Sequence, residues 1–229
     1  RRLGAIMSDA SASLGRRPLD LVVFGATGFT GRLVCEHLAK TGQQRWGIAG
    51  RNYEALRKLR SDLLDIDPTL ARVEIIVARV EDEGALIDMA EQARVLINAV
   101  GPFARFGEPV MAACLEARTD YVDLTGEPDW WRRMVERYDE RARARGVLVI
   151  PACGFDSVPA DLGVQFCVEA LPDGADIEVD GYVQFGGTVS GGTWATALEE
   201  LSEPLRSFRG RDAPWVLHRA ARGKGPHQA

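Results

Sequence analysis

The sequence of 229 residues has little of what marks several classes of protein. No apolar run approaches the roughly 18–20 residues that span a bilayer, so no transmembrane helix is expected. Its 28 Lys and Arg residues are outnumbered by 33 Asp and Glu residues, and this net charge of −5 argues against a nucleic-acid partner. The three histidines are few and scattered, and the four cysteines form no Cys-x-x-Cys pair, so no metal site is expected. These absences predict a cytoplasmic protein, either free or peripheral to the inner face of the membrane.

A familiar catalytic pair is also missing. Ordinary short-chain dehydrogenases move a proton with a Tyr-x-x-x-Lys pair. The tyrosines at positions 53, 121, 138 and 182 are followed four residues later by Arg, Thr, Ala and Gly. That mechanism is therefore excluded. Cys35, Cys114 and Cys167 fall inside helical patterns, and we expect them to be reduced thiols packed as small apolar groups.

Short apolar runs do alternate with helical patterns between residues 19 and 151. Strands are predicted at residues 19–24, 46–49, 73–77, 95–100, 121–124 and 147–150. Helices are predicted at residues 29–40, 53–64, 81–93, around 110–115, and at 128–145. Six strands with helical crossovers predict an α/β fold with a Rossmann-type doubly wound parallel sheet. Such a sheet binds its ligand at the carboxyl ends of the strands.

The segments on either side of this region read differently. Residues 1–18 are expected to be a flexible leader. Beyond Pro151 the sequence predicts a helix at 158–171, a half-exposed strand at 177–185 and a helix at 193–205. One strand and two helices cannot bury a core of their own. We therefore expect residues 152–229 to be the beginning of an α+β substrate domain that is incomplete.

The strongest motif is the glycine-rich run at residues 25–31, which ends a buried strand and opens a helix. Gly25 permits a tight turn, Gly28 lets the backbone approach a pyrophosphate, and Gly31 lets helix and strand pack closely. The N–H groups at the helix start would then face the phosphates. The predicted contacts from this loop are Gly25, Thr27, Gly28, Phe29, Thr30 and Gly31.

Two further turns complete the predicted coenzyme site. After the second strand, where NAD-binding proteins usually carry an acid for the ribose hydroxyl, the sequence has Gly50 followed by Arg51 and Asn52. A guanidinium there can hold a 2′-phosphate, which predicts NADP(H). After the fourth strand a turn lies beside the middle of the coenzyme and its nicotinamide ribose. Its predicted contacts are Val100, Gly101, Pro102 and Phe103.

Five motifs together resemble those of a known family. GATGFTG at 25–31, AGRN at 49–52, NAVGPF at 98–103, YVDLTGE at 121–127 and CGFDSVPADLG at 153–163 resemble the saccharopine dehydrogenase-like oxidoreductases. The branch most similar contains the trans-acting enoyl reductases of polyketide-lipid synthesis, and the resemblance runs from about Leu19 to Ser202. Members are generally longer than this chain, in line with an incomplete second domain.

The resemblance implies hydride transfer from NADPH. In an enoyl reductase the acceptor is the β-carbon of an α,β-unsaturated acyl thioester carried on a synthase. The resulting enolate needs a hydrogen-bond donor, and the α-carbon takes a proton. In a saccharopine-type enzyme the acceptor is an imine carbon. A non-catalytic NADP-binding sensor or scaffold stays open, because no acid/base pair stands out.

The resemblance also implies catalytic candidates near the nicotinamide, at residues 101–103, 125–127 and 155–157. Among these, Asp156, Ser157 and Glu127 carry groups able to orient a substrate or exchange a proton. Asp156 and Ser157 would equally suit the cap of a helix that begins at Val158. Glu127 could equally be the start of the helix that follows at Pro128.

Overall fold

The computed structural model describes residues 17–43, 45–172 and 177–182. The chain divides between Gly154 and Phe155 into two compact units, each described here by itself. The first unit contains all the strands of the described chain. The second contributes helix α7 (Val158–Glu169).

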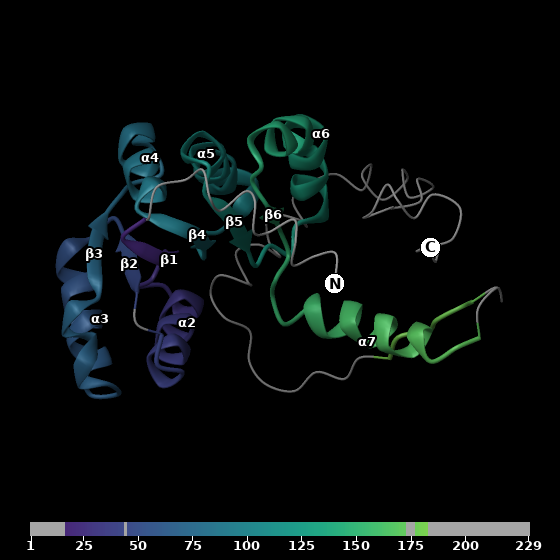
Figure 1. Ribbon diagram of the computed structural model, residues 1–229, viewed down its shortest axis with the longest axis horizontal. Helices are drawn as coiled ribbons and strands as arrows, with labels where there is room; N and C mark the ends of the chain where they lie inside the picture. The colour runs from purple at the N-terminus through teal and green to yellow at the C-terminus, as the bar shows by residue number, and fades with distance from the viewer. Residues whose placement is uncertain (1–16, 44, 173–176, 183–229) are drawn as a thin grey trace. The chain divides into compact units, whose positions relative to one another are not determined.

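The first unit is built on one parallel sheet (Figure 1). Its strands are β1 (Leu19–Phe24), β2 (Trp46–Gly50), β3 (Glu74–Val77), β4 (Ala93–Asn98), β5 (Asp120–Asp123) and β6 (Val149–Ile150). They lie in the order β3-β2-β1-β4-β5-β6, and every neighbouring pair is parallel. The order reverses between β1 and β4, which is where doubly wound sheets bind their ligands. The predicted Rossmann-type sheet is confirmed.

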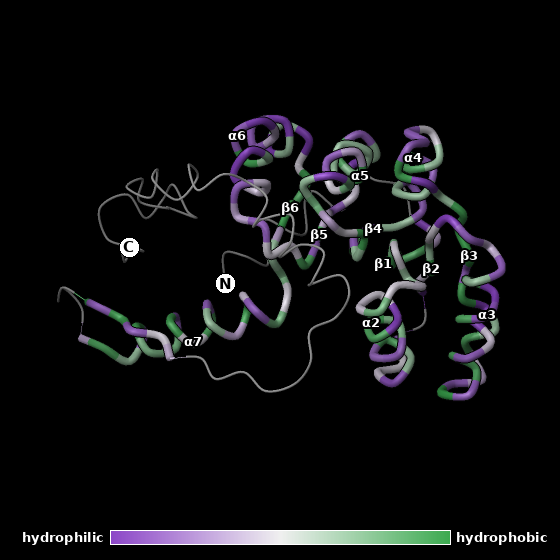
Figure 2. The backbone as a smooth tube through the Cα atoms, turned by 180° about the vertical axis from the view of Figure 1, so that it is seen from behind, coloured by the Kyte–Doolittle hydropathy of each residue, from purple (hydrophilic) through white to green (hydrophobic). Residues whose placement is uncertain are grey.

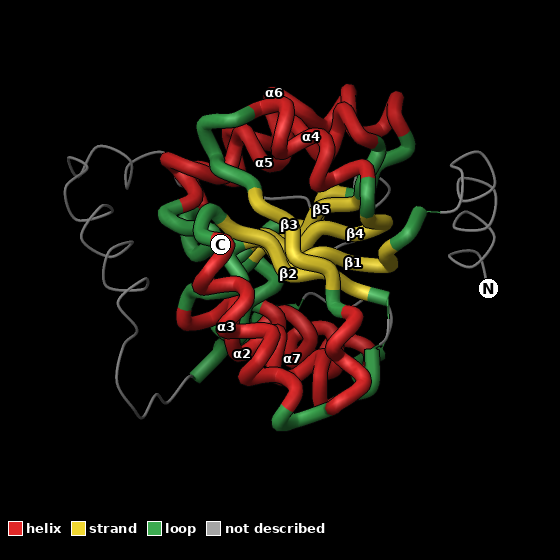
Figure 3. Tube along the Cα trace, turned by 90° about the vertical axis from the view of Figure 1, so that its left-hand side faces the viewer, coloured by secondary structure: helices red, strands yellow, loops and turns green. Residues whose placement is uncertain are grey.

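Helices cover both faces of this sheet. α2 (Phe29–Lys40) and α3 (Tyr53–Leu64) lie on one face, and α4 (Glu83–Glu91), α5 (Phe103–Ala117) and α6 (Pro128–Arg145) lie on the other (Figure 3). A short 3-10 helix (Pro68–Arg72) precedes β3. Along β1, Val22 and Phe24 belong to the core on the α4–α5 side, and Val23 belongs to the core on the α2–α3 side. Burial on both faces explains why β1 is apolar almost throughout.

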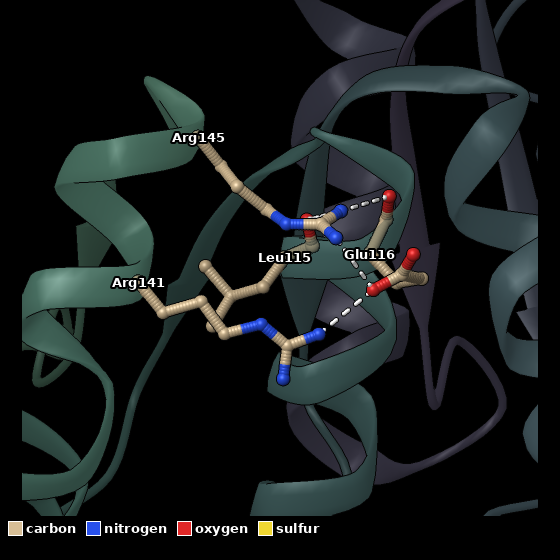
Figure 4. A network of polar contacts seen from close by, with 4 residues as sticks. All are labelled: Leu115, Glu116, Arg141 and Arg145. Carbon is tan, nitrogen blue, oxygen red and sulfur yellow. Dashed lines mark hydrogen bonds and ion pairs between the residues drawn. The ribbon is translucent and has the colours of Figure 1, made fainter.

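The outer helix α6 is strongly hydrophilic along most of its length (Figure 2). Its arginines bind it to the end of α5 (Figure 4). Arg141 and Arg145 contact the Glu116 carboxylate at 2.7 and 3.0 Å. Arg145 also donates to the carbonyl oxygens of Leu115 at 3.2 Å and Glu116 at 2.9 Å. Cations are favourable at a helix C-terminus, so these contacts stabilise the end of α5.

Arg17, which lies before β1, contacts the first unit through its side chain. Arg17 donates from its guanidinium to the carbonyl oxygens of Ala90 (2.8 Å), Ala93 (2.6 Å) and Arg118 (3.1 Å), and also to those of Ala117 and to the Thr119 hydroxyl. These contacts join the ends of α4 and α5 at the amino edge of the sheet. Arg17, which the leader was expected to include, is therefore part of the domain.

Several local expectations need correction. β6 contains two residues rather than four, and α5 begins at Phe103, well before the predicted stretch. Cys35 and Cys114 are buried free thiols, but Cys167 is exposed. Residues 177–182 form no strand, because alternation alone does not make a strand without a paired neighbour. Residues 183–185 and the helix predicted at 193–205 lie outside the described residues.

Across residues 17–43, 45–172 and 177–182, no helix combines the length and apolar character needed to cross a membrane.

Candidate coenzyme site

The glycine-rich loop after β1 has two positions that only glycine fits. Gly25 has φ +83°, and a Cβ atom there would lie 2.8 Å from a methyl group of Val100. A Cβ atom on Gly31 would lie 2.1 Å from the carbonyl oxygen of Gly25. Gly31 thus lets the first turn of α2 pack directly on the loop, the close approach expected of a third glycine in this motif.

The middle of the loop is open. Thr27, Gly28 and Phe29 are exposed. Within the described part of the chain, and apart from its sequence neighbours, a Cβ built on Gly28 would meet the Gly25 carbonyl oxygen alone, at 3.2 Å. α2 begins after Gly28 without a capping side chain, whereas Asn52 caps α3 and Asp82 caps α4. An uncapped helix start behind an exposed glycine suits an anionic phosphate.

The turn after β4 lies against this loop. The Ala99 N–H donates to the Phe24 carbonyl oxygen at 2.8 Å. A methyl group of Val100 lies beside Gly25, where a Cβ atom would otherwise be. Gly101 is exposed, and its peptide bond to Pro102 is cis. The structure therefore brings together the glycine-rich loop and the strand-four turn, two of the three predicted coenzyme segments.

Phe103 supports the turn from the inside. Its ring is 5% exposed and packs on Trp130, with ring centroids 5.8 Å apart. Trp130 in turn requires Gly107, where a Cβ atom would lie 2.5 Å from the indole. The side chain of Phe103, which the sequence placed among the coenzyme contacts, belongs to the core. The exposed backbone of the turn is at Gly101.

The third coenzyme segment follows β2. The N–H groups of Gly25 and Ala26 donate to the Ala49 carbonyl oxygen, at 3.0 and 3.1 Å, and the Ala78 N–H donates to that of Gly50, at 3.1 Å. The carboxyl ends of β1, β2 and β3 are thus aligned. Beside them lies an open groove of about 480 Å³, lined by Arg51, Asn52, Tyr53, Glu54 and Arg79.

Asn52, one of the residues that line this groove, stabilises the start of α3. Its Oδ1 atom accepts from the Ala55 N–H at 3.1 Å and caps α3. Arg51 is exposed, and so is Arg79, which follows β3 and was not predicted as a site residue. Neither guanidinium makes a hydrogen bond or an ion pair with the part of the chain that the structure describes.

A buried polar chain supports the ends of β4 and β5. The Asn98 Nδ2 group donates to the Tyr121 hydroxyl at 3.1 Å, and that hydroxyl donates to Asp123 Oδ2 at 2.8 Å. Asp123 Oδ1 accepts from the N–H groups of Thr125 and Ala152, both at 3.0 Å. Burial raises the pKa of the Asp123 carboxyl, and the nearby Glu127 carboxylate adds to the shift. None of these three side chains was a predicted site residue, although all lie within the recognised motifs.

Glu127 closes the start of α5. Its two carboxylate oxygens accept from the N–H groups of Phe103 at 2.8 Å and Ala104 at 2.6 Å, and the residue is 5% exposed. A carboxylate at a helix N-terminus interacts favourably with the first N–H groups of the helix. Glu127 thus joins the β5–α6 loop to the strand-four turn. To act as a proton donor it would have to give up one of these bonds, and its catalytic role stays a prediction.

Asp156 and Ser157 lie in the second unit. Asp156 is exposed, and Ser157 occupies the position before α7. The Ser157 hydroxyl makes no capping hydrogen bond, so the expected side-chain cap is not formed there. Their catalytic role also stays a prediction. Among the described residues, no three His, Cys, Asp or Glu side chains gather as a metal-binding group.

Residues 21–150 match the sequence model of the saccharopine dehydrogenase NADP binding domain. The chain belongs to this saccharopine dehydrogenase-like family. Its coenzyme is therefore NADP(H). The match covers the whole sheet except the first strand's two leading residues, and it includes all three predicted coenzyme segments.

Two curated relatives are about 40% identical to this chain over the aligned residues. A trans-acting enoyl reductase of Mycobacterium bovis is 40% identical over 197 residues, which cover 82% of this chain and 46% of the relative. A lipid droplet localized protein of Caenorhabditis elegans is 39% identical over 192 residues, covering 80% of this chain and 45% of the relative. The chain thus spans about half the length of the curated relatives it matches.

One solved structure shows the same fold. The apo saccharopine dehydrogenase of Saccharomyces cerevisiae superimposes with a TM-score of 0.52 at 18% identity, over 66% of this chain and 31% of that one. The site's geometry fits an NADP-binding sheet of this strand order. The glycine-rich loop lies where the order reverses, between β1 and β4, and beyond the ends of β2 and β3 lie two arginines that pair with no described residue.

Proposed function

We propose that this chain is the NADP-binding part of a reductase that acts on α,β-unsaturated acyl thioesters carried on a synthase of lipid or polyketide assembly. The observation that carries the proposal is the 40% identity to a trans-acting enoyl reductase, which extends beyond the NADP-binding domain to 82% of the chain.

The proposed coenzyme position follows the carboxyl edge of the sheet. The pyrophosphate would lie on residues 25–31 at the start of α2, and the 2′-phosphate at Arg51. The nicotinamide end would lie at the turn formed by Val100, Gly101 and Pro102. Bound there, NADPH supplies a hydride. The exposed backbone of Thr27, Gly28 and Gly101 supports this path, since each lies open on the same edge.

The chain's own residues would bind, orient and handle protons. As hydride reaches the β-carbon, the electron pair of the double bond moves onto the thioester oxygen, which then needs a hydrogen-bond donor. We assign that donation to Ser157 and the protonation of the α-carbon to Asp156. Glu127 would hold the turn beside the nicotinamide. The role of Glu127 follows from its two bonds to the start of α5. The roles of Ser157 and Asp156 rest on the resemblance of residues 153–163 to the family's motif.

The test is NADPH oxidation, followed at its absorbance, with an enoyl thioester and with an imine as acceptors. It uses this chain and a version extended by the C-terminal half of the Mycobacterium bovis relative. We expect the extended version to oxidise NADPH with the enoyl thioester and not with the imine. Turnover of the imine alone would establish the saccharopine-type reaction. Tight NADPH binding with turnover of neither would establish a sensor or scaffold.

We also propose that the protein works at a lipid surface as a peripheral protein. The support is the relative named for its localisation to lipid droplets. Co-flotation of the chain with vesicles made of neutral and anionic lipids measures this directly. Recovery in the lipid-free fraction at low salt would contradict it.

A further inference from the structure

Arg79 lies next to Arg51 because of the register of two strands. Gly50, the last residue of β2, pairs with Val77, the last residue of β3. The Ala78 N–H then extends this pairing by donating to the Gly50 carbonyl oxygen at 3.1 Å. Arg51 directly follows β2, and Arg79 lies two residues beyond the end of β3, after Ala78. Both line the open groove of about 480 Å³ beside the start of α3.

The groove has an excess of positive charge. Its one carboxylate in the described chain, Glu54, is already 3.1 Å from the guanidinium of Arg57, which is not among the lining residues. Arg51 and Arg79 have no hydrogen bond or ion pair with any described residue. Elsewhere in the same unit, Arg32, Arg141 and Arg145 each contact a carboxylate. Two unpaired guanidinium groups in one groove form a site for a doubly charged anion.

We propose that Arg79 is a second ligand of the coenzyme's 2′-phosphate and, together with Arg51, decides the preference for NADPH over NADH. The proposal rests on the position proposed above for the 2′-phosphate at Arg51. A phosphate monoester carries nearly two negative charges at neutral pH and has three acceptor oxygens. One planar guanidinium can occupy two of those oxygens, and a second guanidinium from the neighbouring strand can reach the third.

The groove also offers a different use for Arg79. A guanidinium can stack on an aromatic ring, and Tyr53, half exposed in the same groove, marks where an adenine ring could lie. An arginine stacked on adenine would strengthen NADPH and NADH equally, since both carry adenine. An arginine on the 2′-phosphate would strengthen NADPH alone. The ratio of the two affinities therefore separates the two roles.

The experiment titrates the 229-residue chain with NADPH, NADH and 2′,5′-ADP by calorimetry. The variants are Arg79→Ala, Arg79→Lys, Arg51→Ala and the double alanine variant. The matched control is Arg94→Ala, an exposed arginine at the opposite, amino edge of the sheet in β4. Circular dichroism and thermal unfolding confirm that each variant is folded.

We expect Arg79→Ala to weaken NADPH and 2′,5′-ADP by about tenfold and leave NADH unchanged, as for the loss of one charge-assisted contact. Arg79→Lys should lose less, because it keeps the charge but not the fork. The double variant should bind NADPH and NADH about equally, and Arg94→Ala should match the wild type.

Two results would overturn the assignment of Arg79 while leaving the NADPH preference standing. One is an Arg79→Ala variant that binds both NADPH and NADH with wild-type affinity, which would make Arg51 sufficient. The other is an equal loss for NADPH and NADH, which would place Arg79 on the adenine. A wild-type chain that binds NADPH no better than NADH would instead remove the proposed position of the 2′-phosphate, and the proposal for Arg79 with it.

Discussion

The polar side chains at the two ends of the sheet's carboxyl edge differ in exposure and in hydrogen bonding. At the β2–β3 end, Arg51 and Arg79 are exposed and make no hydrogen bond or ion pair with the described chain. At the β4–β5 end, Asn98, Asp123 and Glu127 are buried and bonded to neighbouring groups.

The difference separates two ways of building a binding site. The arginines contribute little to the stability of the fold, because no described residue pairs with them. Their guanidinium groups can therefore form hydrogen bonds and ion pairs with a ligand. The buried groups fix the turn beside the nicotinamide, because leaving a buried donor or acceptor unpaired is costly. Substitutions at the β2–β3 end should therefore change affinity alone. Substitutions at the β4–β5 end should change stability and affinity together.

The glycine-rich loop between these ends contains both kinds of position, and it gives the largest expected effect. Gly31→Ala places a Cβ atom 2.1 Å from a backbone oxygen, while Gly28→Ala meets only one atom, at 3.2 Å. We expect Gly31→Ala to cost about 3 kcal/mol or more of unfolding free energy, and Gly28→Ala less than about 1 kcal/mol. Gly28→Ala should nevertheless weaken NADPH, since its proposed role is backbone approach to the pyrophosphate.

Denaturant unfolding and NADPH titration of this matched pair measure both quantities. If Gly28→Ala kept full NADPH affinity, the loop would not be the phosphate site. Equal stability of the two variants would mean that Gly31 is not required for packing.

Glu127 gives the next largest effect, at the other end of the site. Glu127→Ala removes the acceptor for the N–H groups of both Phe103 and Ala104, and we expect a loss of about 2–3 kcal/mol. Glu127→Gln keeps one acceptor oxygen and should lose about half as much. Because the turn is disturbed only at the nicotinamide end, NADPH should bind more weakly while 2′,5′-ADP, which lacks that half, binds as before. A parallel loss for both ligands would show a general loss of folded protein.

These contrasts also show what the sequence could predict. β1 was predicted to the residue because a strand buried on both faces is apolar almost throughout, and α2, α3 and α6 had clear helical periodicity. The start of α5 was missed because residues 98–103 read as a strand and its turn, whereas the strand ends at Asn98 and the helix begins at Phe103.

The sequence identified candidate site residues where a role depends on backbone shape and not where it depends on tertiary contacts. The glycines of residues 25–31 and Arg51 could be identified because each comes just after a predicted strand. Arg79 required the register of β2 against β3, although its place two residues beyond a strand end was a signal that could have been used. The role of Glu127 required knowing that residues 103 and 127 meet, which no local pattern contains.

The pH dependence of stability tests whether burying the Asp123 carboxylate at the β4–β5 end destabilises the fold. Burial raises the pKa of Asp123 in the folded protein, so folding favours its protonated form. Its contribution to stability is therefore fully present at low pH and is lost as the pH rises through the raised pKa. Against Asp123→Asn, the wild type should gain relative stability as the pH falls from above the raised pKa toward the ordinary value of 3.8, by at most about 1.4 kcal/mol per pH unit for one proton. Thermal unfolding across this range measures the difference, and parallel curves for the two proteins would contradict it.

The smallest expected effect is the most direct test of the comparison. Arg51→Ala and Arg79→Ala should each change the unfolding free energy by less than about 0.5 kcal/mol, the usual range for an exposed side chain without partners. Removing one of two like charges in a shared groove could even stabilise the protein slightly, and more so at low salt, where screening is weak. Denaturant unfolding at low and high salt, without ligand, gives the number. With saturating NADPH the wild type should be more stable to denaturant than both variants. A ligand stabilises the folded state more when it binds more tightly, and the wild type should bind NADPH most tightly. If either arginine variant unfolded several kcal/mol more easily without ligand, that arginine would be part of the folded framework, and the two ends of the site would not differ as described.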